Sequence, residues 1–363
     1  MTVAGGFAQS NAHQQLERGL AFWDQRLAKS AIVALETAAR DKETAAAAHE
    51  ALGRIYTFKG WQQESAFPGW HDEPALRERA VTELKAAVAA DPSRTSAQQA
   101  LHVAEGFAAA EAVDPAPPRP EVRTLDAKLL SYQGRSDAPV AEIVTAIDAR
   151  AKAQADPAPY FTGAQILIDR GEYDRAIEMA QKGVPVSDRF IDENLSAYQL
   201  PGKSQGSYAR GRSQAADLIG WALFLKKDYA SAAAKLEEAE RLSQGLDFAN
   251  LFHLGELARA QNAYDRAREY YLNALSLAGG PAPLRQRATE ALAVVAGDKA
   301  AGGLDAWLVP ELARRQEARR AVALRSLVDR PLPNLPLTTV DGRPFDTSGL
   351  QGKVLLLNFF ASW

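Results

Sequence analysis

The sequence predicts an all-α fold, a solenoid of stacked helix pairs, followed by the first strands of an incomplete α/β domain. Two observations lead to this prediction. A five-position pattern of small and large residues recurs 35 residues apart, and a fixed period of this size is typical of helical repeats. Near the end of the chain, a short apolar run follows a proline-rich segment, as expected for a strand that is buried on both faces of a sheet.

The repeated pattern is clearest in the second half of the chain. Its two copies are Gly220, Tyr229, Ala232, Leu236 and Ala239, and then Gly255, Tyr264, Ala267, Tyr271 and Ala274. We expect the two glycines to let the helices of a pair approach closely, and Leu236 and Tyr271 to fill the space between neighbours. One helix pair cannot bury its apolar face alone, so the pairs must stack.

Earlier parts of the chain carry related patterns. They are Gly19, Phe22, Ala31, Leu35 and Ala38; Gly53 and Tyr56, continued by Ala80, Leu84 and Ala87; and Tyr160, Gly171, Tyr173, Ala176 and Ala180. The second pattern fits only if about 15 residues are inserted, which we assign to 61–75. The spacing resembles that of the tetratricopeptide repeat family over most of residues 12–280. This resemblance implies that a protein or peptide partner binds in the concave groove of the solenoid.

Three segments interrupt the repeats. Residues 113–120 carry four prolines and are predicted to be an extended linker between repeats in 12–112 and further repeats in 121–330. The glycine-containing stretch 188–212 is predicted to be irregular. Residues 311–330 are predicted to form a basic helix with a solvated, mixed-charge face. Its charged residues are Arg314, Arg315, Arg319, Arg320, Arg325, Arg330, Glu311, Glu317 and Asp329.

The last segment, residues 331–363, contains an ordered series of motifs. Residues 336–345 are predicted to form a hairpin around Asp341-Gly342, and 354–360 an interior strand. The series Asp341-Gly342, Leu350, Gly352-Lys353 and Phe359 to Trp363 resembles the start of a thioredoxin-like domain of the TlpA type. The resemblance implies a thiol–disulfide oxidoreductase whose nucleophilic cysteine directly follows Trp363, with Phe360 and Trp363 flanking the site.

Two alternatives to this function stay open. One is a non-enzymatic tetratricopeptide interaction protein, and the other is a peroxiredoxin-type antioxidant domain. The residues that follow Trp363 distinguish them. The chain as given contains no cysteine, so it has no thiolate nucleophile, and neither disulfides nor thiolate metal sites.

Composition restricts the remaining functions. The net charge of −3 over 363 residues gives no electrostatic reason to expect nucleic acid binding, and no apolar run is long enough to span a membrane. No cofactor is predicted. Residues 1–11 are interpreted either as the remnant of a signal peptide, with small residues around Ala4 to Ala8, or as a disordered start. The first interpretation places the protein in the periplasm or cell envelope, and the second leaves a cytoplasmic location open.

The insertion at 61–75 is the best candidate for a binding loop. It brings together Trp61, Phe67, Trp70 and His71, which would either form a partner site or pack the loop onto the solenoid. Residues 197–204 partly match a phosphate-binding loop, but no buried strand precedes them, so nucleotide binding is not predicted. The five histidines are scattered without metal-ligand spacing, and no metal site is predicted.

Overall fold

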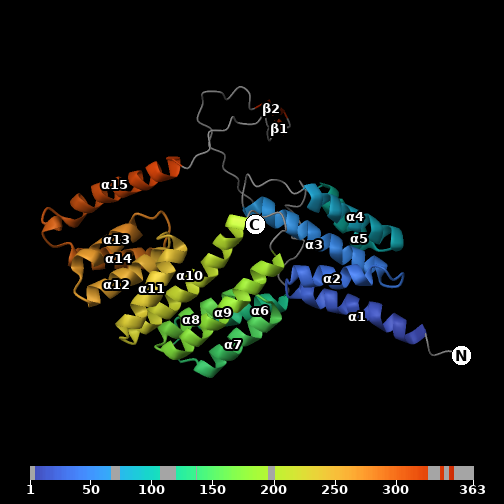
Figure 1. Ribbon diagram of the computed structural model, residues 1–363, viewed down its shortest axis with the longest axis horizontal. Helices are drawn as coiled ribbons and strands as arrows, with labels where there is room; N and C mark the ends of the chain where they lie inside the picture. Colours follow the sequence, from blue (N-terminus) through green and yellow to red (C-terminus); the bar gives the residue numbers. More distant parts are fainter. Residues whose placement is uncertain are drawn as a thin grey trace.

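The computed structural model describes residues 5–66, 74–106, 120–135, 137–194, 201–325, 336–338 and 343–346. This part of the protein is almost entirely α-helical (Figure 1). The elements in chain order are α1 (Gly5–Asp24), α2 (Ala28–Ala38), α3 (Ala45–Ala66), α4 (Pro74–Ala90), α5 (Thr95–Gly106), α6 (Pro120–Leu130), α7 (Val140–Ala153), α8 (Ala158–Asp169), α9 (Tyr173–Asn194), α10 (Pro201–Leu225), α11 (Tyr229–Ser243), α12 (Phe248–Ala260), α13 (Tyr264–Leu275), α14 (Ala282–Val295), the 3-10 helix η2 (Gly297–Ala300), α15 (Leu304–Arg325), β1 (Pro336–Thr338) and β2 (Pro344–Asp346).

Successive helices pack side by side in pairs, as the repeat pattern predicts. The pairs are α1–α2, α3–α4, α8–α9, α10–α11 and α12–α13. The first helix of a pair also contacts the first helix of the next pair, or the single helix that follows the pair. Such contacts join α1 with α3, α3 with α5, α8 with α10, α10 with α12, and α12 with α14. We call these helices the A row. Curvature of a stack brings the elements on its concave side closer together, so this contact is the one expected along a concave surface.

The predicted role of the glycines is confirmed. A Cβ atom at Gly255 of α12 would lie 2.4 Å from the ring of Tyr271 on α13, and one at Gly53 of α3 would lie 2.3 Å from Leu84 on α4. The same contact recurs between Gly19 and Leu35 and between Gly220 and Leu236. Glycine therefore opens the space in each pair that the bulky residue of the second helix occupies.

The helices form two blocks with separate hydrophobic cores. The first block, α1–α5, has one cluster whose residues lie between 16 and 104. The second block, α6–α15, has three clusters that run into one another, because Phe224 and Tyr270 each pack against two of them. None of these clusters of described residues contains residues of both blocks. The second block lies beside the first where α9 contacts α2.

The prediction of an irregular stretch at 188–212 is wrong. Helix α9 continues to Asn194, and α10 begins at Pro201, a residue type that is well tolerated in the first turn of a helix. Gly211 is a packing position and not a loop signal. A Cβ atom there would lie 2.2 Å from the hydroxyl of Ser187 on α9, so the glycine allows these two long helices to approach.

The described residues after α15 form one small hairpin. β1 and β2 are antiparallel, and Leu337 is paired with Phe345, within the range predicted for a hairpin. A ladder of this size occurs in many folds and does not identify a domain. The predicted strand at 354–360, together with Phe360 and Trp363, lies outside the described residues.

Candidate functional site

The predicted binding loop is only partly described. Trp61 belongs to α3, which continues to Ala66, so this tryptophan lies on a helix and not in a loop as predicted. The sequence suggested a loop because the repeat pattern is interrupted there, but the helix simply runs past the usual length of the unit. Phe67, Trp70 and His71 lie outside the described residues.

A groove on the A row of the first block is the clearest candidate for a binding surface. It lies between α3 and α5 and has a volume of about 480 Å³. Its lining combines apolar atoms with a few polar groups: Arg54, Thr57, Gln98, Gln99, Ala100, His102 and Val103. The A row brings these residues together because Arg54 and Thr57 are one helical turn apart on α3, as are Gln99 and Val103 on α5.

A buried carboxylate fixes the polar side of this groove. The side chain of Glu50 is only 8% exposed and accepts hydrogen bonds from Arg54, at 3.0 Å, and from Arg94. The hydroxyl of Ser96 donates to the same carboxylate at 3.1 Å, and Arg54 also donates to the carbonyl of Ser96 at 3.1 Å. The guanidinium of Arg54 is therefore held in one position.

The arginines of this cluster keep Glu50 ionised. Two guanidinium groups share one carboxylate, and the arginines keep 36% and 35% side-chain exposure, for Arg54 and Arg94 respectively. Burial alone would raise the pKa of the Glu50 carboxyl, but the hydrogen bonds from Arg94, Arg54 and Ser96 outweigh it and lower that pKa below its usual value. Glu50 is thus ionised near neutral pH, and Arg94 also interacts electrostatically with Asp91.

The sequence pattern does not predict this cluster. The pair Glu50 and Arg54 has the four-residue spacing of an intrahelical ion pair, a common pattern on solvated helix faces. The contribution of Arg94 comes from the turn before α5, 44 positions away from Glu50. No local pattern signals such a contact.

A second groove lies farther along the A row. Helices α8, α9 and α10 surround a space of about 330 Å³. Its apolar walls are formed by Phe161, Phe190 and Ile191. Helix α10 contributes two polar lining residues, Arg210 and Gln214. The two blocks therefore each present an apolar groove with a basic residue.

Buried side chains fill the space between α10 and α12 in the A row. Trp221 stacks on His253 with ring centroids 4.1 Å apart, and His253 Nδ1 lies 3.0 Å from a carboxylate oxygen of Asp217. Asn250 donates to the same carboxylate at 3.0 Å and to the carbonyl of Leu236 at 3.1 Å. All of these side chains are buried, so this part of the row is a packed polar and aromatic contact between repeats.

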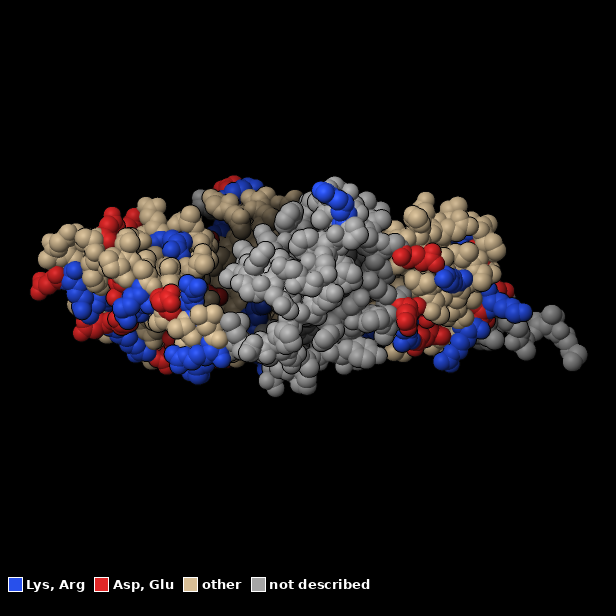
Figure 2. Space-filling view, turned by 90° about the horizontal axis from the view of Figure 1, so that it is seen from above, with Lys and Arg blue, Asp and Glu red and all other residues tan. Residues whose placement is uncertain are grey.

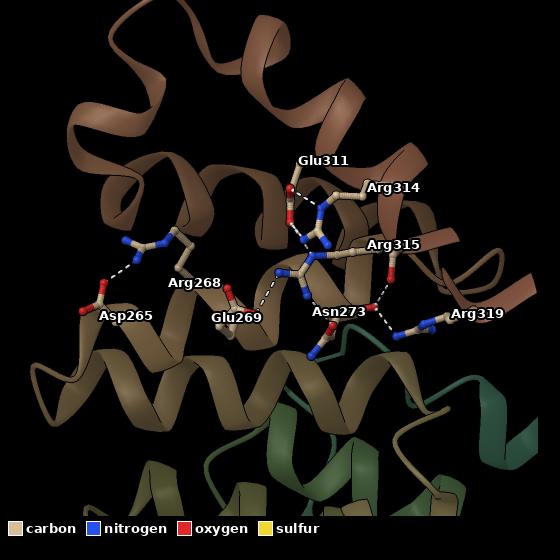
Figure 3. Close-up of polar contacts among 9 residues, drawn as sticks. Asp265, Arg268, Glu269, Asn273, Glu311, Arg314, Arg315 and Arg319 are labelled. Atoms are coloured by element: carbon tan, nitrogen blue, oxygen red, sulfur yellow. Dashed lines mark hydrogen bonds and ion pairs between the residues drawn. The ribbon is translucent and has the colours of Figure 1, made fainter. Parts of the chain in front are cut away.

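The prediction that the arginine-rich helix presents a solvated face is only partly right, because Arg315 contacts another helix. Figure 3 shows Arg315 of α15 pointing toward α13, where it bonds Glu269 and Asn273, each at 2.7 Å. It also donates to Glu311 on its own helix at 2.8 Å and is only 13% exposed. Leu308 is buried against the core of the second block. Helix α15 begins at Leu304, seven residues before the predicted start, and its first half covers the end of the array.

Other arginines of α15 do match the predicted solvated face. Arg314 and Arg320 are 67% and 72% exposed, and their partners Glu311 and Glu317 lie on the same helix. Arg330 and Asp329 lie outside the described residues. Figure 2, in which the molecule is seen from above, shows acidic and basic residues interspersed over the described surface at both ends.

The described residues contain no group of three or more His, Cys, Asp or Glu side chains placed to hold a metal ion. Within the same ranges, none of the helices has the length and apolar character needed to cross a membrane. Of the partial phosphate-loop match, residues 201–204 form the first turn of α10. The preceding described element is the helix α9 and not a strand.

Comparison with known proteins identifies one repeat. A tetratricopeptide repeat model matches residues 251–284, which include most of α12 and all of α13. This match contains Gly255 and Tyr271 and confirms the predicted repeat type in that segment. A search of curated proteins finds no match.

Several solved structures resemble the chain, and two of them serve as examples. One is BtubC (BKLC) from P. vanneervenii, with 17% sequence identity and a TM-score of 0.30, covering 73% of this chain and 96% of that chain. The other is yeast Tom70, with 14% identity and a TM-score of 0.22, covering 90% of this chain and 67% of that chain. The repeat assignment rests on the family match and on the helix pairs. Together they define a tetratricopeptide-like solenoid, an architecture suited to a protein-interaction scaffold.

Proposed function

We propose that the protein is an interaction scaffold that binds a segment of a partner protein in the groove between α3 and α5. The observation that carries this proposal is the repeat match at 251–284 within an array of helix pairs. Solenoids of this kind bind partners along their extended concave surfaces. The groove lies on the A row, has a largely apolar lining and presents an arginine that is already fixed in place.

The chemistry of the groove favours a segment that combines apolar residues with an acidic one. Arg54 lines the groove, its side chain is 36% exposed, and its guanidinium is held by Glu50 and by the carbonyl of Ser96. An arginine that is already held in position loses little conformational entropy when it pairs with a carboxylate. At both ends of the face shown in Figure 2, acidic and basic residues are interspersed, so this view offers no large field of one sign for recognition.

A displayed peptide library tests this proposal. The wild-type chain should enrich apolar peptides that contain Asp or Glu, and Gln99→Glu should abolish the enrichment, because it places a negative charge on an exposed position of the groove. Gln133→Glu makes the same change at an exposed site outside this groove and serves as the control. Enrichment that survives Gln99→Glu, or no enrichment at all, would contradict the assignment of this groove.

The C-terminal segment supports a second part of the proposal. Residues 331–363 resemble the start of a TlpA-type thioredoxin-like domain, so we expect the complete protein to be a thiol–disulfide oxidoreductase of the cell envelope. The nucleophilic cysteine is expected directly after Trp363. The scaffold would then bring this domain to the protein that it binds.

The gene sequence beyond the codon for Trp363 tests the second part. A Cys-x-x-Cys motif, with insulin reduction by the complete protein, would support the oxidoreductase. Absence of cysteine would instead identify a non-enzymatic interaction protein, and a single cysteine in a Thr-x-x-Cys setting a peroxiredoxin-type domain. Cell fractionation tests the location, since a cytoplasmic pool alone would contradict the envelope assignment.

A further inference from the structure

The two blocks meet at the turn between α1 and α2. The carboxylate of Glu193, near the end of α9, accepts hydrogen bonds from the backbone N–H and the hydroxyl of Ser30, at 2.9 and 2.7 Å. The next residue, Asn194, donates its side-chain amide to the carbonyl of Arg26 at 2.9 Å. The backbone N–H of Ala155 donates to the carbonyl of Gln25 at 3.2 Å. These contacts join residues that are more than 120 positions apart in the sequence.

Glu193 satisfies a need of α2 that its own residues do not meet. The residue that precedes the helix, Leu27, makes no side-chain capping bond, so the first N–H groups of α2 lack a local acceptor. A carboxylate at this end of a helix both accepts these hydrogen bonds and interacts favourably with the helix dipole. The second block therefore supplies the N-terminal cap of a helix in the first block.

Among the described residues, no hydrophobic cluster extends across this junction. The first-block cluster and the three second-block clusters share no residue. Leu27 is fully buried at the turn, so the junction contains an apolar side chain beside these hydrogen bonds. Interfaces between blocks that are mainly polar permit relative motion, whereas a large shared apolar core would prevent it.

We infer that Glu193 and Asn194 form a reversible latch on the α1–α2 turn, and that its release lets the two blocks change their relative orientation. The latch sets the positions of the α3–α5 groove and the α8–α10 groove relative to each other. It consequently controls whether one extended partner reaches both grooves. This conformational device does not depend on which partner the scaffold binds.

The chain is well suited to a distance measurement because it contains no native cysteine. Spin labels on Ala89→Cys in α4 and Ala141→Cys in α7 report the distance between the blocks, since both alanines are exposed. A second pair, Ala141→Cys and Ala234→Cys in α11, reports a distance within the second block. Pulsed electron paramagnetic resonance on the 363-residue chain then yields both distributions.

The latch predicts a narrow inter-block distribution in the wild type that broadens and shifts in the double variant Glu193→Ala/Asn194→Ala. The distribution within the second block should stay unchanged. Glu178→Ala is the matched control, because this glutamate also lies on α9 but away from the junction. Its side chain is 40% exposed and pairs with Arg175 and Lys182 of the same helix. An unchanged inter-block distribution in the double variant, or a wild-type distribution that is already as broad, would overturn the latch.

A variant on the opposite side separates release of the latch from fraying of α9. Ser30→Ala removes the hydroxyl donor without altering α9 and must also broaden the inter-block distribution. If only the variants in α9 broaden it, the effect arises from a damaged helix and the latch is wrong. Broadening of the distance within the second block would lead to the same conclusion.

Discussion

At the scale of single residues, the array depends on glycines that face bulky side chains. Each A-row glycine that the repeat pattern identified lies against a large residue of the next helix, and the missing Cβ leaves the space that this residue fills. The sequence predicted these contacts because the two residues recur at a fixed distance. It did not predict Glu50 with Arg94, because a long-range ion pair leaves no periodic trace.

Gly255→Leu and Gly220→Leu should each destabilise the protein. The first added carbon would lie 2.4 Å from Tyr271 or 2.7 Å from Leu236, far inside van der Waals contact. Overpacking of this kind costs roughly 1–3 kcal/mol or more. Chemical denaturation measures the loss, and Gly279→Ala is the control because nothing lies within 4 Å of a Cβ atom there. Equal effects at all three positions would show that these glycines are not sites of close approach.

Glu50→Gln should cost about 1.5–3 kcal/mol near neutral pH, the range for hydrogen bonds to charged groups. The pKa of Glu50 in the folded state lies below its ordinary value of 4.5. Its charge therefore contributes fully to stability above pH 4.5, and this contribution is lost as the pH falls through the lowered folded-state pKa. Unfolding free energies measured against pH should differ at pH 7 and converge in acid. A constant difference would contradict this role of the carboxylate.

At the scale of elements, the helix pairs could be predicted but the lengths of several helices could not. The glycines in 188–212 suggested a loop, yet Gly211 is a packing position between two long helices. In α15, the arginine pattern suggested a solvated face, but Arg315 points toward α13. Periodicity shows which face of a helix is apolar, but it does not show when a charged residue meets a partner on another helix.

Arg315→Ala should loosen α15 from α13. The substitution removes hydrogen bonds to Glu269 and Asn273 and leaves their acceptors without this partner. Hydrogen exchange of α15 should accelerate, with a loss of about 1.5–3 kcal/mol in local stability for these charge-assisted bonds. Arg320→Ala, at a position that is 72% exposed, should leave the exchange unchanged. If neither variant accelerates exchange, α15 is held by its apolar residues alone, and similar acceleration by both would show that the contacts of Arg315 with α13 are not what holds it.

At the scale of the whole molecule, the helical array and the C-terminal segment are expected to be independent. β1 and β2 pair with each other, and neither makes extensive contact with a helix among the described residues. Deleting residues 331–363 should therefore leave the helical circular dichroism signal and the melting temperature almost unchanged. A fall of many degrees would place this segment within the fold of the array.

The separate core of the first block has a consequence for biosynthesis. All residues of its cluster precede residue 105, so this block can fold as soon as α5 leaves the ribosome. Glu193, which caps α2, is synthesised 163 positions after Ser30. At the elongation rates of about 5–20 residues per second typical of cells, α2 remains without its cap for roughly ten to thirty seconds. During this interval the N–H of Ser30 and its hydroxyl bond to water instead, and completion of α9 supplies their carboxylate acceptor.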